Sequence, residues 1–362
     1  MYKPPFTITN KMLSLCISIT EKVGQINNYQ SLKRMPILRK NNRIKSIHSS
    51  LAIEANSLSL NQVKDVIEGK VVIGPKKEIQ EVKNAYNLYS MFDKFDCYSE
   101  KDLLVAHGIL TYLIDEESGK YRNHGEGVFD ENRIIFVAPP ENMVPTLMRD
   151  LFDWLKNDKE TPLLIKSCIF HYEFVFIHPF GDGNGRTARF WQNLLLSNWN
   201  SVFEYIPLES QIHKYQSEYY NKIDICHKSG NSNEFIEFIL LMINEVLDEV
   251  LLSSQKESRH ISEQANRLLG VMDDEIPYSA NELLSLLNIK SKETLRASYL
   301  NPALENGLIK MTLPDKPNSK NQRYVKWVLL LKELDKWLYY HTLVNNIYLC
   351  NITSLIWTFI TK

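Results

Sequence analysis

A glycine-rich turn between two apolar runs constrains the fold of this chain more than any other feature. The turn, HPFGDGNGRTAR, occupies residues 178–189. LLIKSCIFHYEFVFI precedes it and FWQNLLLSNW follows it, and both runs have an apolar density compatible with helices. Across residues 10–260, apolar positions recur at spacings of three and four, and strand-like alternation is scarce. The sequence therefore predicts a mainly α fold in which this turn joins two helices.

Composition limits where such a turn can obtain its binding energy. The chain has 362 residues, of which 44% are hydrophobic and 23% charged, as in folded globular proteins. This length predicts two domains, or one domain and an appendage. The formal net charge is -1, so no overall field attracts the chain to nucleic acid or to an anionic membrane. A site for anions must therefore come from a local cluster of residues.

The cysteines and the N-terminus indicate a cytoplasmic protein. The cysteines are scattered and odd in number, and they form no CxxC pair, so free thiols in a reducing compartment are expected. The N-terminal residues, MYKPPFTITNKMLSL, have polar interruptions where a signal peptide needs an unbroken apolar stretch. The five cysteines are Cys16, Cys97, Cys168, Cys226 and Cys350.

One segment departs from the helical pattern. Within GEGVFDENRIIFVAPP, residues 125–140, two short β-favouring pieces at 128–129 and 134–137 are separated by the turn-forming residues 130–132. The pattern predicts a β-hairpin on a helical body. Two interpretations of the hairpin remain open: a surface excursion without a partner, or an edge that holds an extended peptide through main-chain hydrogen bonds.

The composition changes after a long helix that is predicted to end near Glu257. Ser279 is a plausible cap for a short helix, and a second helix is predicted over residues 291–306. PDKPNSK then lies between two strand-like segments. The two short helices and these segments together suggest a small winged-helix-like domain. Such domains often bind DNA. Because lysines and arginines are sparse here, contact with a protein or homodimer formation is at least as well supported.

The last segment, residues 328–362, combines many aromatic and aliphatic residues. Lys336, Asn345, Asn346 and Asn351 interrupt it, so a membrane-spanning helix is not expected. Packing against the body or against a partner is the favoured interpretation, and a non-native extension of the reading frame is the alternative.

The glycine-rich turn has the chemistry of a phosphate site. Its end becomes the N-terminus of the following helix, where unpaired N–H groups and the helix dipole favour an anion. Gly183 and Gly185 allow the backbone to approach a phosphate, and Asn184 between them can donate a hydrogen bond. Arg186 and Arg189, three residues apart, can bind two phosphates with charge-assisted bonds.

Two further side chains of the turn point to catalysis. Asp182 could cap the helix, or it could hold Mg²⁺ together with phosphate oxygens. His178 has an ordinary pKa of about 6.5 and is a candidate general base for a hydroxyl nucleophile. The chain has no GxxxxGK[ST], which excludes a P-loop nucleotidase, and the turn does not follow a strand, which argues against a Rossmann site.

HPFGDGNGRTAR resembles the Fic-family signature HPFx[DE]GNGRxxR at every defined position. The resemblance implies a Fic-type helical bundle with a hairpin flap, and transfer of AMP from ATP to a Ser, Thr or Tyr hydroxyl of a protein target or of the protein itself. It implies that His178 deprotonates the target hydroxyl and that Asp182 binds Mg²⁺. It also implies that Asn184 and the loop backbone hold the α-phosphate, Arg186 the β-phosphate and Arg189 the γ-phosphate. The flap residues that it assigns to the target are Val128, Ile134, Ile135, Phe136 and Val137.

A glutamate upstream of the turn interrupts an apolar stripe. Residues 43–60 are predicted to form a helix with Glu54 in the middle of the stripe, where a carboxylate requires a cationic or hydrogen-bonding partner. The residues alone do not name that partner. Ser50 to Glu54 resembles the family's inhibitory motif [ST]xxxE[GN], with Ala55 in the place of glycine or asparagine. The resemblance implies that Glu54 pairs with Arg189 and obstructs the γ-phosphate. The apolar stripe consists of Ile44, Ile47, Leu51 and Leu58.

Three alternatives to an autoinhibited AMP transferase stay open. The site could transfer another phosphate-containing group, or Glu54 could position a water that removes AMP from a modified target. The protein could instead be a regulator that binds DNA or protein through its C-terminal part and uses the Fic site to sense nucleotide. The predicted domains are an N-terminal helical region at 1–105, a catalytic core at 106–257, a winged-helix-like domain at 258–327 and the tail at 328–362.

Overall fold

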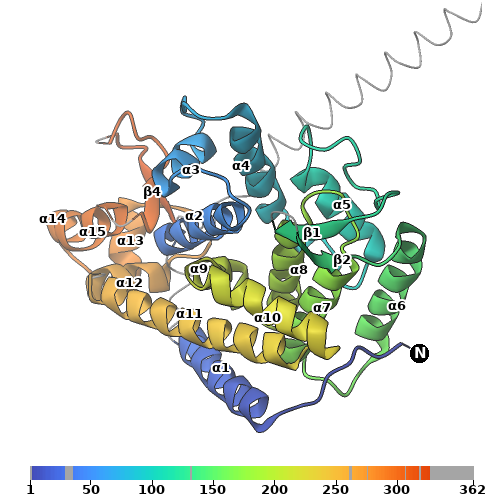
Figure 1. Ribbon diagram of the computed structural model, residues 1–362. Helices are drawn as coiled ribbons and strands as arrows, with labels where there is room; N and C mark the ends of the chain where they lie inside the picture. Colours follow the sequence, from blue (N-terminus) through green and yellow to red (C-terminus); the bar gives the residue numbers. More distant parts are fainter. Residues whose placement is uncertain are drawn as a thin grey trace, which may run out of the picture. The chain divides into compact units, whose positions relative to one another are not determined.

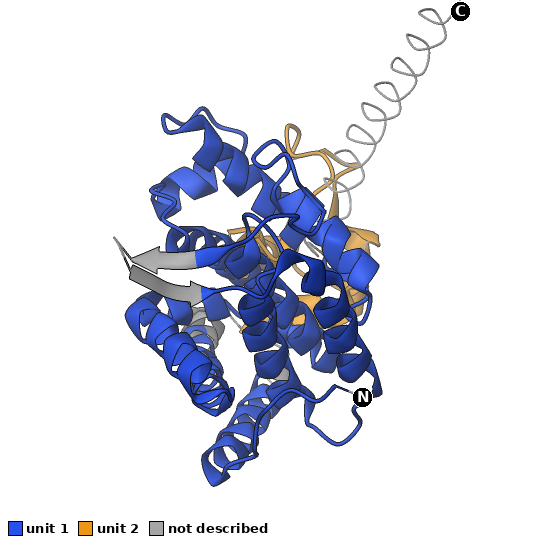
Figure 2. Cartoon of the chain, turned by 45° about the vertical axis from the view of Figure 1, so that its right-hand side comes forward, with its two compact units in different colours: residues 1–260 blue, residues 261–362 orange. Residues whose placement is uncertain are grey.

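The structure is mainly α-helical, as predicted, and divides into two compact units, residues 1–260 and 261–362 (Figures 1 and 2). It is a computed structural model. The residues that it describes are 2–28, 36–130, 133–260, 263–274, 276–305, 307–317 and 319–326. The tail at 328–362 lies outside the described residues, as does Cys350. The other four cysteines are free thiols.

Unit 1 is a helical body with one hairpin. Its first five helices are α1 (Asn10–Asn28), α2 (Pro36–Ile53), α3 (Leu60–Ile67), α4 (Lys76–Tyr89) and α5 (Glu100–Leu110). After the hairpin come α6 (Val144–Asn157), α7 (Leu163–Ile177), α8 (Asn184–Trp199), α9 (Leu208–Lys214), α10 (Gln216–Ser229) and α11 (Asn233–His260). Short 3-10 helices at Phe92–Lys94, Glu141–Met143 and Ser201–Tyr205 connect some of these elements.

The two helices on either side of the glycine-rich turn form the centre of unit 1. Helix α7 packs against α8, α6 and α11, and α8 also contacts α5 and α2 (Figure 1). Apolar residues occur all around α7, which is why it is buried on every side. Phe170, Phe174, Phe190 and Trp191 are fully buried between these helices. This packing holds the turn in a rigid setting.

The predicted hairpin is present. Strand β1 (Gly127–Asp130) pairs antiparallel with β2 (Arg133–Val137), with Gly127 opposite Val137 and a register shift between Val128 and Phe129. The side chains at 128–130 and 133–136 are outside the described part. Val137 is described, and its side chain is exposed. Contact of the hairpin with a target peptide stays a prediction.

Unit 2 has its own small core and sheet. The elements of unit 2 are α12 (Glu263–Val271), β3 (Pro277–Ser279), α13 (Ala280–Leu287), α14 (Lys292–Thr294), a π-helical stretch η4 (Leu295–Leu300), α15 (Asn301–Glu305), β4 (Ile309–Met311) and β5 (Arg323–Lys326). The three strands form an antiparallel sheet in the order β3-β5-β4. Ser279 caps α13 by a capping box with Glu282, as the sequence predicts for the start of that helix.

The hydrophobic core of unit 2 includes Leu268, Leu283, Leu287 and Leu300. The winged-helix assignment, DNA binding and homodimer formation stay predictions. Among the residues described in both units, no helix is long and apolar enough to cross a membrane.

Candidate functional site

The turn between α7 and α8 begins and ends in left-handed backbone. His178 follows the last residue of α7 with φ 50° and ψ 60°, and Gly183 precedes α8 with φ 82° and ψ 5°. A Cβ at position 183 would lie 3.0 Å from the Thr111 Cγ2 atom, so both backbone angle and space favour glycine there. The turn therefore leads within a few residues from His178 to the N-terminus of α8, where a helix has unpaired N–H groups.

Asn184 closes the turn from inside. Its Nδ2 atom donates to the Phe180 carbonyl at 2.6 Å, and its Oδ1 atom accepts from the Phe180 N–H at 3.0 Å. Phe180 is fully buried and stacks on the His107 ring with 3.6 Å between centroids. The resemblance to Fic proteins implied that Asn184 holds the α-phosphate. In this structure both ends of the buried Asn184 amide hydrogen-bond the Phe180 backbone, and a contact with the α-phosphate stays a prediction.

His178 has an imidazole that is neutral at neutral pH. Burial lowers the pKa of its imidazole, an effect that outweighs a hydrogen bond with the Val175 backbone and the nearby charge of Glu126. A lowered pKa keeps the ring unprotonated at neutral pH, so it can accept a proton.

Arg122, which no sequence pattern pointed out, contacts the backbone of His178. It is 3% exposed, and it donates through Nε to the His178 carbonyl at 2.7 Å, and through Nη2 to the Pro139 carbonyl at 2.6 Å. It also donates to the carbonyls of His124 at 2.8 Å and Ile177 at 3.4 Å. One side chain thus joins the segment on each side of the hairpin to the start of the glycine-rich turn.

One carboxylate oxygen of Asp182 accepts two hydrogen bonds. Oδ1 accepts from the Gly183 N–H at 2.5 Å and from Arg186 Nη2 at 2.7 Å, while Oδ2 lies 3.8 Å from the Lys77 ammonium. Burial alone would raise the pKa of Asp182, but the charge and hydrogen bond of Arg186 lower it below the ordinary value. The carboxylate is therefore ionised at neutral pH, and its side chain is 41% exposed.

The surroundings of Asp182 fit one kind of metal ion. The described residues contain no group of three or more His, Cys, Asp or Glu side chains arranged to hold a metal. A cage made entirely of protein ligands is thus absent from this part of the chain. Mg²⁺ often binds to one or two carboxylates and completes its shell with phosphate oxygens and water. A single exposed carboxylate beside an anion site suits that mode of binding.

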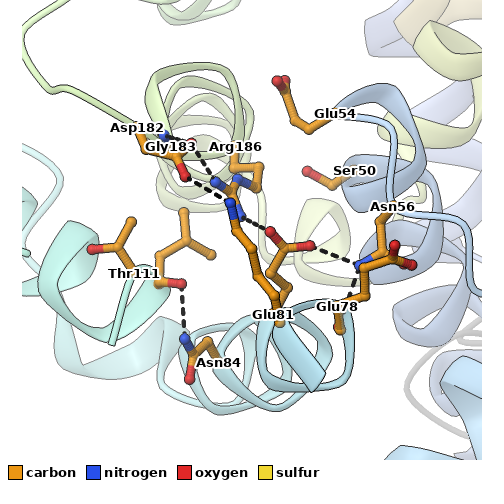
Figure 3. Close-up of polar contacts among 12 residues, drawn as sticks. Ser50, Glu54, Asn56, Glu78, Glu81, Asn84, Thr111, Asp182, Gly183 and Arg186 are labelled. Atoms are coloured by element: carbon orange, nitrogen blue, oxygen red, sulfur yellow. Dashed lines mark hydrogen bonds and ion pairs between the residues drawn. The ribbon is translucent and has the colours of Figure 1, made fainter. Parts of the chain in front are cut away.

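Arg186 lies between two carboxylates. Its Nη2 atom contacts Asp182, and its Nη1 atom lies 3.2 Å from Glu81 Oε1 on α4 (Figure 3). Its side chain is 4% exposed. The sequence offers no reason to pair Glu81 with the turn, because Glu81 and Arg186 lie 105 residues apart along the chain.

Arg189 is bound by the end of α2. Its Nη2 atom donates to Glu54 Oε1 at 2.9 Å and to the Ser50 carbonyl at 2.9 Å, and its Nε atom donates to Ser50 Oγ at 3.1 Å. Burial alone would lower the pKa of Arg189, but the charge and hydrogen bond of Glu54, together with the nearby Tyr219 and Tyr220, raise it above the ordinary value. The structure thus brings together Ser50, Glu54 and Arg189, the three residues that the inhibitory motif had suggested.

The predicted helix over 43–60 is too long, and its account of Glu54 is wrong. Helix α2 ends at Ile53, and Ala55 has φ 64°. Helical periodicity therefore stops before Glu54, whose side chain is 35% exposed and does not lie in a buried stripe. Arg189 is the buried partner, with 1% of its side chain exposed. The apolar residues predicted for the stripe are all buried: Ile44, Ile47, Leu51 and Leu58.

Ala55 occupies the position in which helix ends usually have glycine. The Ala55 N–H donates to the Ala52 carbonyl at 3.0 Å, and the Asn56 N–H donates to the Leu51 carbonyl at 3.1 Å. These two bonds define a Schellman motif, which requires a left-handed residue at Ala55. The departure from the motif's usual glycine or asparagine therefore leaves the helix end intact.

Two donors at the start of α8 have no partner. Among the described residues, Arg186 Nε and Arg189 Nη1 are buried without a hydrogen bond. Unpaired buried donors on cations are costly, and an anion at the N-terminus of α8 would satisfy them. The Glu54 carboxylate already enters this space, because a Cβ at Gly185 would collide with its Oε1 atom. The start of α8 therefore presents two buried cations, each with one donor atom that the described residues leave without a partner.

Two parts of the chain match known protein families. Residues 97–196, which include the turn, match the family described as "Fic/DOC family". Residues 263–325 match "Filamentation induced by cAMP protein Fic-like, C-terminal domain". A crystal structure of a Fic family protein from Desulfovibrio desulfuricans G20 has 40% sequence identity and a TM-score of 0.69, covering 90% of this chain and 98% of that chain. The chain belongs to the Fic family.

Curated Fic relatives are more distant and longer. Protein adenylyltransferase fic-1 of Caenorhabditis elegans is 26% identical over 244 residues, which cover 64% of this chain and 45% of the relative. Protein adenylyltransferase Fic of Aedes aegypti is 28% identical over 278 residues, which cover 74% of this chain and 51% of the relative. This Fic chain spans about half the length of these curated relatives. A solved structure of residues 134–508 of C. elegans Fic-1 has 23% identity and a TM-score of 0.57, which supports the fold.

Proposed function

We propose that this Fic protein transfers AMP from ATP to a Ser, Thr or Tyr hydroxyl of a protein target. The observation that carries the proposal is the pair of unpaired donors, Arg186 Nε and Arg189 Nη1, at the N-terminus of α8 beside a neutral histidine. The names of the adenylyltransferase relatives support the same reaction.

The residues of the turn divide the work of this reaction. His178 takes the proton of the target hydroxyl, whose oxygen forms a bond to the α-phosphorus as the bond from that phosphorus to the bridging oxygen breaks. Pyrophosphate leaves with the bonding electrons. Arg186 and Arg189 stabilise its charge through charge-assisted hydrogen bonds, and the N–H groups at the start of α8 face the α-phosphate. The hairpin β1–β2 aligns the target segment through its main chain.

Asp182 is the proposed ligand of Mg²⁺. The ion, when bound, neutralises charge on the phosphates. Arg186 keeps the Asp182 carboxylate ionised and directs one of its oxygens, so that the other can face the ion.

We further propose that Glu54 inhibits the reaction. Its carboxylate uses Arg189 and lies against Gly185, where the γ-phosphate would otherwise bind. Competition for one arginine accounts for inhibition without any change in the turn.

Labelling with ATP that carries ³²P at the α-position tests both proposals. Glu54→Gly should raise incorporation about tenfold or more over wild type, since ~1.4 kcal/mol of differential binding is a tenfold effect. His178→Ala in the Glu54→Gly background should abolish it. Glu54→Gln is the matched control, because it keeps the shape of the side chain but loses its charge. Equal labelling of Glu54→Gly with and without His178 would refute the assigned chemistry, and equal labelling of wild type and Glu54→Gly would refute the inhibition.

A further inference from the structure

Glu81 lies between Arg186 of the glycine-rich turn and Asn56 of the segment that follows α2. Its Oε1 atom pairs with Arg186 Nη1 at 3.2 Å, and its Oε2 atom accepts from Asn56 Nδ2 at 2.8 Å. Figure 3 shows the resulting chain of contacts from Asp182 through Arg186 and Glu81 to Asn56. Glu81 is 9% exposed, so its charge is largely removed from solvent. A buried carboxylate in this position is stable because both of its oxygens have partners.

The geometry fixes the plane of the Arg186 guanidinium. One terminal nitrogen is held from α4 by Glu81 and the other from the turn by Asp182. Asp182 is 41% exposed and only four residues away on the same segment, so it provides the weaker constraint. Glu81 comes from a separate helix and is nearly buried, so it constrains the Arg186 guanidinium more strongly than Asp182 does. The Nε atom of Arg186, which has no partner among the described residues, keeps a defined direction as a result.

Asn56 connects Glu81 to the inhibitory segment. It follows Glu54 by two residues, immediately after the left-handed Ala55. Its Nδ2 atom also lies 3.3 Å from the Glu78 carbonyl, and its Oδ1 atom accepts from the Leu58 N–H at 3.1 Å. The Asn56 side chain is therefore fixed by its own segment and by α4. The segment after α2 thus contacts Arg189 directly and Arg186 through Glu81.

We propose that Glu81 is a positioning residue that holds Arg186 for the β-phosphate of the nucleotide, and that Asn56 sets the position of Glu81. The inference rests on the proposed function, in which Arg186 binds that phosphate. Glu81 does not compete with the phosphate, because its two oxygens are occupied by Arg186 and Asn56. It differs in this respect from Glu54, whose carboxylate enters the phosphate position.

The test compares binding of ADP and AMP by titration calorimetry in the Glu54→Gly background, with Mg²⁺ present. These two nucleotides differ by the β-phosphate, so the ratio of their dissociation constants measures the contribution of that group. Glu81→Ala should lower the preference for ADP about tenfold and leave AMP affinity within about twofold, as for loss of one charged interaction. Glu81→Gln keeps the shape of the side chain and should lower the preference for ADP by a smaller factor. Asn56→Ala should also lower the preference for ADP. Lys83→Ala, at an exposed position on α4, is the matched control and should change neither value.

Arg186→Ala separates this inference from the proposed function. If Arg186→Ala removes the ADP preference and Glu81→Ala does not, the positioning role is wrong and the proposed function stands. Equal weakening of AMP and ADP by both Glu81 variants would also overturn the positioning role, because it would indicate a general structural effect. If Arg186→Ala itself leaves the ratio unchanged, the assignment of Arg186 to the β-phosphate fails.

Discussion

At the scale of single residues, the site depends on backbone that ordinary side chains avoid. His178 and Ala55 both have positive φ, although neither is glycine. His178 holds that conformation at the start of the turn, where Arg122 donates to its carbonyl. Ala55 holds it at the end of α2, where the Schellman bonds require it. Such residues store strain that the surrounding contacts must offset.

Ala55→Gly should therefore stabilise the protein. Glycine adopts a positive φ without the Cβ clash that alanine has, a difference of about 1 kcal/mol. Thermal or urea unfolding would measure it as a rise in the free energy of unfolding. Ala52→Gly, three residues earlier in α2, is the control and should have the opposite effect by about 0.5–1 kcal/mol. Destabilisation by both substitutions would contradict the strain assigned to Ala55.

At the scale of elements, three segments meet at Arg122. The end of α7, the loop before β1 and the residues after β2 each offer it a backbone carbonyl. The side chain has five donors in a planar arrangement, so it can serve several carbonyls at once. Arg122 thus joins the two ends of the hairpin to His178, the candidate proton acceptor, although these residues lie in different elements.

Arg122→Ala should lower both stability and labelling. The carbonyls of His124, Pro139, Ile177 and His178 would lose their shared donor, at a cost of about 3 kcal/mol in the free energy of unfolding. Arg122→Ala should also lower labelling in the Glu54→Gly background. Arg122→Lys, which has fewer donors in another geometry, should have stability and labelling between those of wild type and Arg122→Ala. Urea unfolding and the α-³²P assay would measure the two effects. Lys120→Ala, at an exposed position two residues away, should be neutral, and an equally neutral Arg122→Ala would show that the contacts are dispensable.

The contacts across elements also mark how far the sequence could predict the site. The turn at 178–189 and the cap at Ser279 were predictable, because their determinants are adjacent in the chain. The pairing of Glu54 with Arg189 came from resemblance, and the residues alone placed Glu54 wrongly in a continuous helix. Arg122 and Glu81 left no local signal of their contacts with the turn, since the His178 carbonyl and Arg186 lie 56 and 105 residues away from them. Only the packing of α4, α5, α7 and α8 brings these groups together.

At the scale of the whole molecule, the buried polar groups make stability depend on pH. His171 lies at the centre of unit 1, where its ring nitrogens bond Gln192 Oε1 at 2.6 Å and the Tyr219 hydroxyl at 2.9 Å. Burial lowers the pKa of His171 to about 3. The unfolded chain takes up this proton near pH 6.5, whereas the folded chain does not. The contribution of neutral His171 is therefore complete above pH 6.5 and is lost as the pH falls toward 3.

This linkage predicts a difference between wild type and His171→Gln that depends on pH. The free energy of unfolding of wild type should fall on acidification by up to ~1.4 kcal/mol per pH unit from this group alone. The variant has no titrating group at this position. The difference in free energy of unfolding between wild type and variant should therefore become smaller as the pH falls from 7 to 5. Urea unfolding at several pH values would measure the difference, and a constant difference would refute the assignment.

The exposure of Glu54 has a kinetic consequence. The helix α2 ends before this residue, so the carboxylate can leave Arg189 by rotation about its own side-chain bonds, with the backbone bonds of the Schellman motif intact. Exposed side chains rotate within picoseconds to nanoseconds, far faster than helices rearrange. Release of the proposed inhibition is then governed by how strongly the incoming group competes for Arg189, and no slow opening step has to precede it.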